Sequence, residues 1–267
     1  MLHKDNQKLM SGLEAIYRDY TVRAYVEPDP LQFLYQYPDP GDREIVGLIA
    51  ALLAYGRVCQ ILKSVSWVLA VMGPSPREYV MIAGDREMAS DFEGFRHRFN
   101  TGSHIRALLL GIRLNLDRYG SLNQAFVQGY SSRDDTILPA LSRFVRSLKL
   151  GGDTGYLTAD PMLNSACKRN HLFLRWMVRS DAVDPGGWTG IPPSRLLVPL
   201  DTHMHAVGTM LGFTLRKQAD LRTVMEVTAG FRTVCAEDPV RYDFRLTRYG
   251  IRKEMDPMDL KARLCRG

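Results

Sequence analysis

Residues 196–213 read LLVPLDTHMHAVGTMLGF, in which Asp201, Thr202, His203 and His205 stand between two apolar runs. An aspartate is a favoured N-cap because its side-chain oxygen accepts a hydrogen bond from a backbone N–H about one turn later. The segment therefore predicts a helix that begins at Asp201. A carboxylate and two imidazoles at a helix start also suit an active site, and both interpretations have to be weighed against the rest of the chain.

Helical periodicity extends over most of the remaining sequence. The segments with apolar residues at helical spacing are 47–71, 104–120, 136–152, 164–179, 219–234 and 239–253. The first of them is apolar on most of its circumference, which predicts either one buried central helix or a broken pair. Segment 164–179 has Asn164 or Ser165 as its expected cap, whereas residues 181–195 are rich in Gly and Pro and predict a loop. We expect an all-α fold for residues 1–267, built as one unit or as two intermixed helical lobes that flank a cleft.

Charge favours a polyanionic partner. The chain has 35 Lys and Arg against 29 Asp and Glu, a net charge of +6, and a pI near 9.2, which suits nucleic acid without requiring it. Two basic clusters have helical spacing: Lys168, Arg169, Arg175 and Arg179, and then Arg241, Arg245, Arg248, Arg252 and Lys253. Such clusters either follow phosphates along a helix face or form a solvated surface.

Several kinds of site have no signature in the sequence. The four cysteines are scattered without a CxxC pair, so we expect free thiols and no zinc or iron–sulfur site. Serine-nucleophile, phosphate-loop and dinucleotide motifs are missing as well. No apolar stretch is long enough for a membrane span. These observations predict a cytoplasmic protein without a membrane contact, a metal or a cofactor.

Lysine chemistry remains a candidate. Lys168 lies in the first turn of a predicted helix, where the helix dipole and the neighbouring Arg169 disfavour an additional proton on its amine. A neutral amine is a nucleophile. A metal site at Asp201, His203 and His205 is the competing candidate, but residues 201 and 205 share a helix face while residue 203 points elsewhere.

The chain resembles the helix-hairpin-helix, Gly/Pro-rich loop and aspartate (HhH-GPD) superfamily of DNA glycosylases. The motifs that carry the resemblance are PLDTHMH, the Gly/Pro-rich loop at 184–193 and, more weakly, REIVGLIAALLAYGRVCQI at 43–61. More specifically, YPDPGDREIVGLIAALLAYGR, PLDTHMH and DPVRYDFRLTRYGI are similar to a bacterial family of uncharacterised proteins in this superfamily, of the DUF2400 type.

The resemblance implies roles for individual residues. The essential carboxylate of the superfamily falls on Asp201, and the lysine of its bifunctional members falls on Lys168. Their separation of 33 residues, 201 − 168, is similar to that in the archaeal 8-oxoguanine glycosylase branch. In place of the usual Leu-Pro-Gly-x-Gly hairpin this chain has TADPMLNSACKR at 158–169, which contains no glycine, so the resemblance does not extend to DNA clamping by that hairpin.

The resulting hypothesis is a monomeric DNA repair enzyme that acts on double-stranded DNA with a damaged base. Lys168 and Asp201 would excise an oxidised purine such as 8-oxoguanine, with or without a β-lyase step. His203, Arg57 and Arg169 would contact DNA, and Trp188, Tyr55, Trp176 and Phe173 are candidate platforms for an extruded base. A nucleic-acid-binding protein that lacks the chemistry is the first alternative, and a metal-dependent hydrolase is the second.

Overall fold

A computed structural model describes residues 2–252 and 254–265. The fold is built from helices and one small antiparallel hairpin. The α-helices are α1 (Leu2–Tyr20), α2 (Pro40–Leu52), α3 (Val58–Met72), α4 (Pro76–Ile82), α5 (Asp85–Asp91), α6 (Gly102–Tyr119), α7 (Leu122–Val127), α8 (Leu138–Leu148), α9 (Lys168–Val178), α10 (Thr202–Met210), α11 (Leu221–Arg232), α12 (Asp243–Ile251) and α13 (Pro257–Cys265). The 3₁₀ turns are η1 (Arg23–Tyr25), η2 (Pro30–Gln36), η3 (Lys149–Gly151), η4 (Pro161–Leu163) and η5 (Pro193–Arg195), and the strands are β1 (Arg96–His97) and β2 (Asn100–Thr101).

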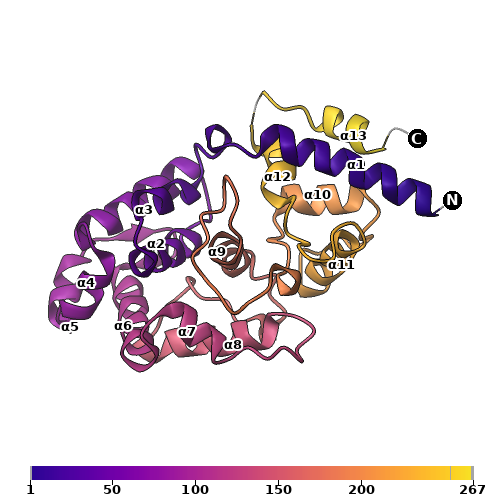
Figure 1. The fold of residues 1–267 in the computed structure, drawn as a ribbon. Coiled ribbons are helices and arrows are strands. Elements are labelled where there is room, and N and C mark those ends of the chain that lie inside the picture. Colours follow the sequence, from indigo (N-terminus) through magenta and orange to yellow (C-terminus); the bar gives the residue numbers. More distant parts are fainter. Residues whose placement is uncertain (1, 253, 266–267) are drawn as a thin grey trace.

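The helices form two groups with α9 between them (Figure 1). Helices α2–α8 make up one group, and α1 joins α10–α13 in the other, so that both described ends of the chain lie on the same side of the molecule. The predicted all-α class is confirmed, since the strands contribute only the pairs Arg96–Thr101 and His97–Asn100.

The apolar segment at 47–71 forms two helices separated by a break, which is one of the two arrangements that the sequence predicted. Helix α2 begins at Pro40, with the Asp39 carboxylate accepting hydrogen bonds from the amides of Gly41 and Asp42, and it ends at Leu52. The chain then turns through Gly56, whose φ of 99° lies in a region that favours glycine, before α3 begins. This break leaves Tyr55 and Gly56 at the surface facing the start of α9.

Helix α9 runs through the centre of the core. Phe173, Trp176 and Met177 are all buried. Phe173 and Met177 pack toward α2, where Gly47 allows close approach: a Cβ there would lie 3.3 Å from the Met177 sulfur. The helix begins at Lys168 and not at residue 164, because Asn164 and Cys167 both have left-handed backbone angles, with φ of 59° and 44°. The expected cap at Asn164 or Ser165 is therefore wrong.

The loop at 181–195 is fixed to the core by Glu44 of α2. This buried carboxylate accepts hydrogen bonds from the amides of Leu122 and Asn123, at 2.8 and 3.0 Å, and from the Trp188 indole at 2.9 Å. Burial raises the pKa of Glu44, while these three bonds favour its charged form. The predicted Gly/Pro-rich loop is thereby attached to α2, and the amides of Gly186 and Trp188 attach it to α9 through the carbonyls of Trp176 and Met177.

Both interpretations of the arginine clusters are wrong for their central members, because these arginines are buried. Arg175 of α9 binds the carboxylates of Asp184 and Asp243. Arg179 binds Asp181, Asp184 and Asp238, and Arg245 and Arg248 of α12 are also inside. Burial of an arginine requires a compensating charge, and for Arg175, Arg179 and Arg248 that charge comes from Asp29, Asp181, Asp184, Asp238 and Asp243. Lys253 lies outside the described residues.

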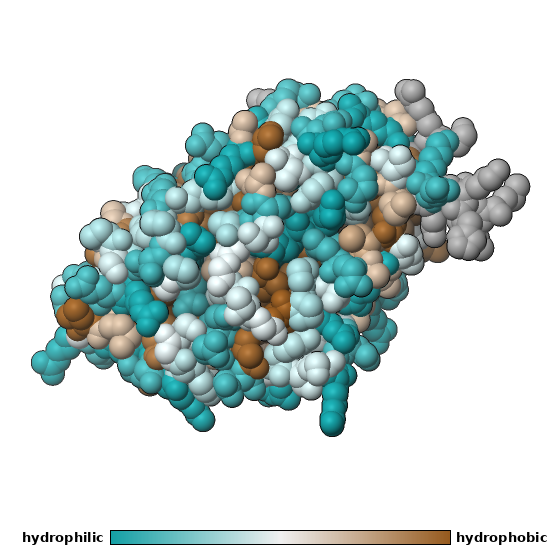
Figure 2. Space-filling view, viewed as in Figure 1, coloured by the Kyte–Doolittle hydropathy of each residue, from teal (hydrophilic) through white to brown (hydrophobic). Residues whose placement is uncertain are grey.

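Within residues 2–252 and 254–265, no single helix has both the length and the apolar character to cross a membrane; α3 and α4 reach that threshold only when taken together across a bend of 59°. Figure 2 shows one face of the molecule, which is largely hydrophilic with an apolar patch near its centre.

Candidate functional site

Two helix starts meet at the predicted lysine and aspartate. Asp201 is the N-cap of α10, and its Oδ1 accepts a hydrogen bond of 2.8 Å from the Met204 amide. Its other oxygen, Oδ2, lies 3.7 Å from Nζ of Lys168, the first residue of α9. The Lys168 side chain is 35% exposed and that of Asp201 is 18% exposed. One carboxylate therefore both starts a helix and faces an amine that solvent and ligands can reach.

The start of α9 keeps its backbone amides free of a side-chain cap. Cys167, at the N-cap position, makes no side-chain capping bond to the helix. The first N–H groups of a helix have no partner within the helix and carry partial positive charge. Lys168 thus stands at a helix end that favours anions.

Lys168 lies on the wall between two hollows. The first has a volume of about 520 Å³ and the second about 490 Å³, and Ala54, Lys168 and Ala219 line both. The first hollow continues to Asp201, His203 and residues of α12, and the second passes Tyr55 and the start of α9. Volumes of this size fall in the range of small-molecule sites.

Two ion pairs line the first hollow. Asp243 and Arg175 form a buried ion pair in its wall, and Arg248 binds Asp29 at 2.7 Å. Burial raises the pKa of Asp243 to about 6, against the lowering effect of Arg175 and with a further raising effect of Asp201. Oδ1 of Asp243 is buried and has no hydrogen-bond partner among the described residues.

His203 also lines the first hollow, where its position depends on Gly250 of α12. A Cβ at Gly250 would lie 2.0 Å from Nδ1 of the His203 ring. The ring thus occupies space that only a glycine at position 250 leaves open. His205 is turned elsewhere, since its Nε2 lies 2.8 Å from the carbonyl oxygen of Arg216.

The imidazoles and Asp201 do not converge. In the part of the chain that the structure describes, no group of three or more His, Cys, Asp or Glu side chains could hold a metal ion. The hydrolase alternative therefore has no geometric support in these residues.

The predicted DNA-contacting residues divide between the second hollow and the core. Tyr55 lines the second hollow, and Arg57 is exposed beside it at the start of α3. Arg169 lines it too, but two of its guanidinium nitrogens donate to the carbonyls of Leu52 and Tyr156, and its guanidinium carbon lies 4.7 Å from the centroid of the Tyr55 ring. Arg169 therefore holds the wall of the hollow together.

The structure does not bring Trp188 to the site. Its side chain is 6% exposed, packs in an edge-on contact with Phe173 and donates to Glu44. Trp176 and Phe173 are buried in the same core. The prediction that these three rings form a platform for an extruded base is wrong, because no face of these rings is open to a ligand.

A family model described as a protein of unknown function (DUF2400) matches residues 29–252. The chain belongs to the DUF2400 family. No curated protein and no solved structure gives a match. The DUF2400 segment holds every charged residue that lines the first hollow, from Asp29 to Arg248. The region that defines the family is thus the region that builds the site.

Two acidic residues of this DUF2400 site were not expected from the sequence. Asp243 and Asp29 come from α12 and from the residue before η2. The motif DPVRYDFRLTRYGI contains Asp243 and carried part of the family resemblance, so the signal was present, but nothing in its spacing tells which of its charges faces a hollow.

Proposed function

We propose that this protein is a DNA glycosylase that removes a damaged purine through Lys168 and Asp201. The observation that carries the proposal is the 3.7 Å separation of the lysine Nζ and the aspartate Oδ2 on the wall between two hollows. A nucleophile, an oriented carboxylate and a cavity beside both are the components that covalent base excision needs. The HhH-GPD resemblance gives the same assignment.

In this mechanism an extruded nucleotide places its base in the first hollow. The neutral Lys168 amine attacks C1′ of the sugar, and the bond from C1′ to the purine nitrogen breaks. The electron pair of that bond leaves with the base, which takes up a proton from water, while Asp201 accepts the proton that the attacking amine loses. The negative charge of Asp201 also stabilises the positive charge that develops on the sugar.

Ring opening then yields a Schiff base between Lys168 and the sugar. Loss of a proton from C2′ breaks the bond from C3′ to the phosphate oxygen, which is the β-lyase step, and water releases the lysine. The second hollow supports the DNA backbone, because the uncapped start of α9 favours a phosphate.

Borohydride trapping tests the proposal. Wild-type protein is incubated with duplexes that contain 8-oxoguanine, uracil, hypoxanthine or an abasic site, and the reduced Schiff base is detected as a covalent complex. We expect trapping on the 8-oxoguanine duplex by the wild type and none by Lys168→Gln. Lys217→Gln is the matched control, because Lys217 is an exposed lysine outside both hollows and its loss should leave trapping unchanged.

Two outcomes would count against the proposal. If the wild type neither traps nor releases a base from any damaged duplex, the chemistry is absent. If the wild type lacks this chemistry but binds DNA with an affinity that depends on salt, a nucleic-acid-binding protein without catalysis is the better description.

A further inference from the structure

An exposed group of two aromatic rings and an arginine lies beside the second hollow. Phe99 at the tip of the β1–β2 hairpin is 65% exposed, and Tyr156 is 62% exposed. Their ring centroids are 5.6 Å apart, and the Arg98 guanidinium carbon lies 5.5 Å from the Phe99 ring centroid. We call Arg98, Phe99 and Tyr156 the hairpin platform.

The platform stands on a rigid base. Asn100, fully buried, accepts a hydrogen bond of 2.9 Å from the Tyr156 amide through its side-chain oxygen and donates to the Tyr55 hydroxyl. The His97 ring is held between Ser64 and the carbonyl of Tyr55, at 2.9 and 3.1 Å. The exposed rings therefore project from a network with little freedom to fold inward.

The hairpin turn itself has an unusual backbone. Arg98 has a φ of 53°, in the left-handed region that few residues other than glycine, asparagine and aspartate adopt. Such conformations concentrate at functional sites, where the surrounding structure holds them in place. At Arg98 the result is an arginine beside an exposed phenylalanine at the outer end of the hairpin.

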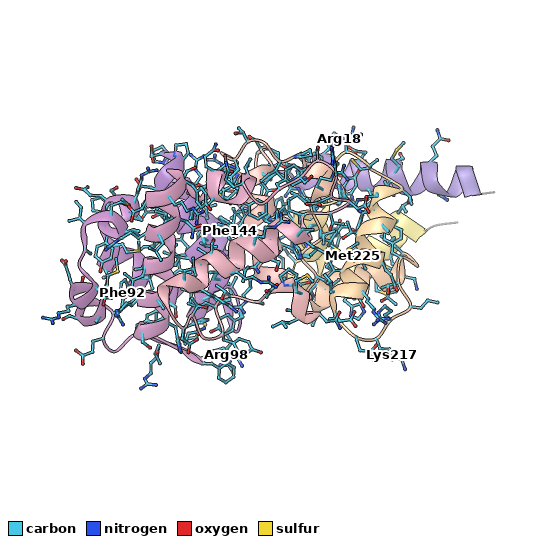
Figure 3. The ribbon with its side chains drawn as sticks, turned by 90° about the horizontal axis from the view of Figure 1, so that it is seen from below. Arg18, Phe92, Arg98, Phe144, Lys217 and Met225 are labelled. Carbon is cyan, nitrogen blue, oxygen red and sulfur yellow. The ribbon has the colours of Figure 1, made fainter. Side chains whose placement is uncertain are left out.

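The platform is continuous with the proposed DNA path. Arg169, the residue after Lys168, donates to the carbonyl of Tyr156, and the side chain of Arg98 lies close to Gly56, in the wall of the second hollow. Figure 3 shows Arg98 at the lower edge of the molecule in that view. Arg57, next to Gly56, and Arg96 of β1 are exposed as well.

We propose that the hairpin platform stacks on an unpaired nucleobase next to the extrusion site. Aromatic rings and arginine planes bind the face of any base, whatever its identity, and apolar side chains that enter a duplex hold a base step open. The arginines complement the phosphates that flank such a base. This inference rests on the proposed function for DNA as the ligand, but not on the lysine chemistry.

The test is equilibrium binding of fluorescent DNAs. The probes are a fully paired duplex, the same duplex with one unpaired 2-aminopurine, and a short single strand. For Phe99→Ala and Tyr156→Ala we expect about 10- to 100-fold weaker binding of the two DNAs with unpaired bases. We also expect loss of the 2-aminopurine quenching that stacking causes, and a change of less than about threefold for the paired duplex.

Controls separate stacking from folding and from catalysis. Ile82→Ala removes an equally exposed apolar side chain at the end of α4 and should bind all three DNAs like the wild type, whereas Phe99→Trp should retain the quenching. Trapping without any platform effect overturns this inference alone, and a platform effect without trapping overturns only the glycosylase mechanism. Failure to bind any of the three DNAs overturns the platform.

Discussion

Asp201 carries out two tasks with different oxygens, and substitution can separate them. Asparagine caps helices about as well as aspartate, so Asp201→Asn should retain the hydrogen bond to the Met204 amide and lose only the charge that faces Lys168. Asp201→Ala loses both. We expect the free energy of unfolding to fall by about 1 kcal/mol in the alanine variant and by less than about 0.5 kcal/mol in the asparagine variant.

The effect on base release follows from the role of Asp201 in the proposed mechanism. Its Oδ2 lies 3.7 Å from the Lys168 Nζ, so it can accept the proton that the attacking amine loses. Removal of a positioned proton acceptor slows a reaction by about 10²- to 10⁴-fold. Both side chains are partly exposed and water can replace part of this role, so we expect single-turnover base release to be about 100-fold slower in Asp201→Asn.

The assay combines urea unfolding of both variants with single-turnover release of 8-oxoguanine from a labelled duplex. Slow release with normal stability in Asp201→Asn is the expected pattern. If Asp201→Asn releases base at the wild-type rate, Asp201 serves only as a helix cap and the reasoning fails. Normal stability of Asp201→Ala would instead refute the capping role.

Three further outcomes are expected. Glu44→Gln should lower the free energy of unfolding by about 3 kcal/mol in urea titrations, because an amide cannot accept the three hydrogen bonds of this carboxylate; Trp188→Phe, which removes only one of them, should cost about half as much. Burial lowers the pKa of His171 to about 4. Below pH 6.5 this histidine therefore binds a proton in the unfolded chain but stays neutral in the folded chain, and the free energy of unfolding falls as the pH drops. From pH 7 to pH 5 the wild type should lose about 2 kcal/mol more than His171→Leu, and equal losses would contradict the neutral buried ring. Gly250→Ala should displace His203 and slow base release as much as His203→Ala does; a wild-type rate would show that the position of the ring does not matter for base release.

Local sequence patterns predicted the helices that start and stop with local signals. Asp201 is the cap of α10 as expected, and α6 ends at Gly120 in the left-handed conformation that the glycine indicated. The start of α9 differs from the prediction because Asn164 and Cys167 have left-handed backbone conformations. A cysteine has no local preference for this conformation. The carbonyl of Asn164 accepts a bond of 3.4 Å from the Leu221 amide, a partner more than fifty residues away along the chain.

The pairing of Lys168 with Asp201 could be predicted from the sequence, but the cavity beside them could not. The resemblance supplied Lys168 and Asp201, and the structure places them together. Burial of arginines and of Trp188 depends on partners such as Glu44 and Asp243, which lie far away in the chain. A sequence shows the charges but not their pairing, so buried ion pairs look like a solvated face and a core indole looks like an exposed loop residue.

The pairing of α1 with α12 and α13 also bears on how the protein is made. During translation, α1 leaves the ribosome long before residues 243–265 exist, so its partners are missing from the nascent chain. The wall of the first hollow shares this delay, since Asp29 meets Arg248 only when α12 has emerged. A growing chain can fold α2–α8 early, but it acquires a complete cavity beside Lys168 only after α12 has been synthesised.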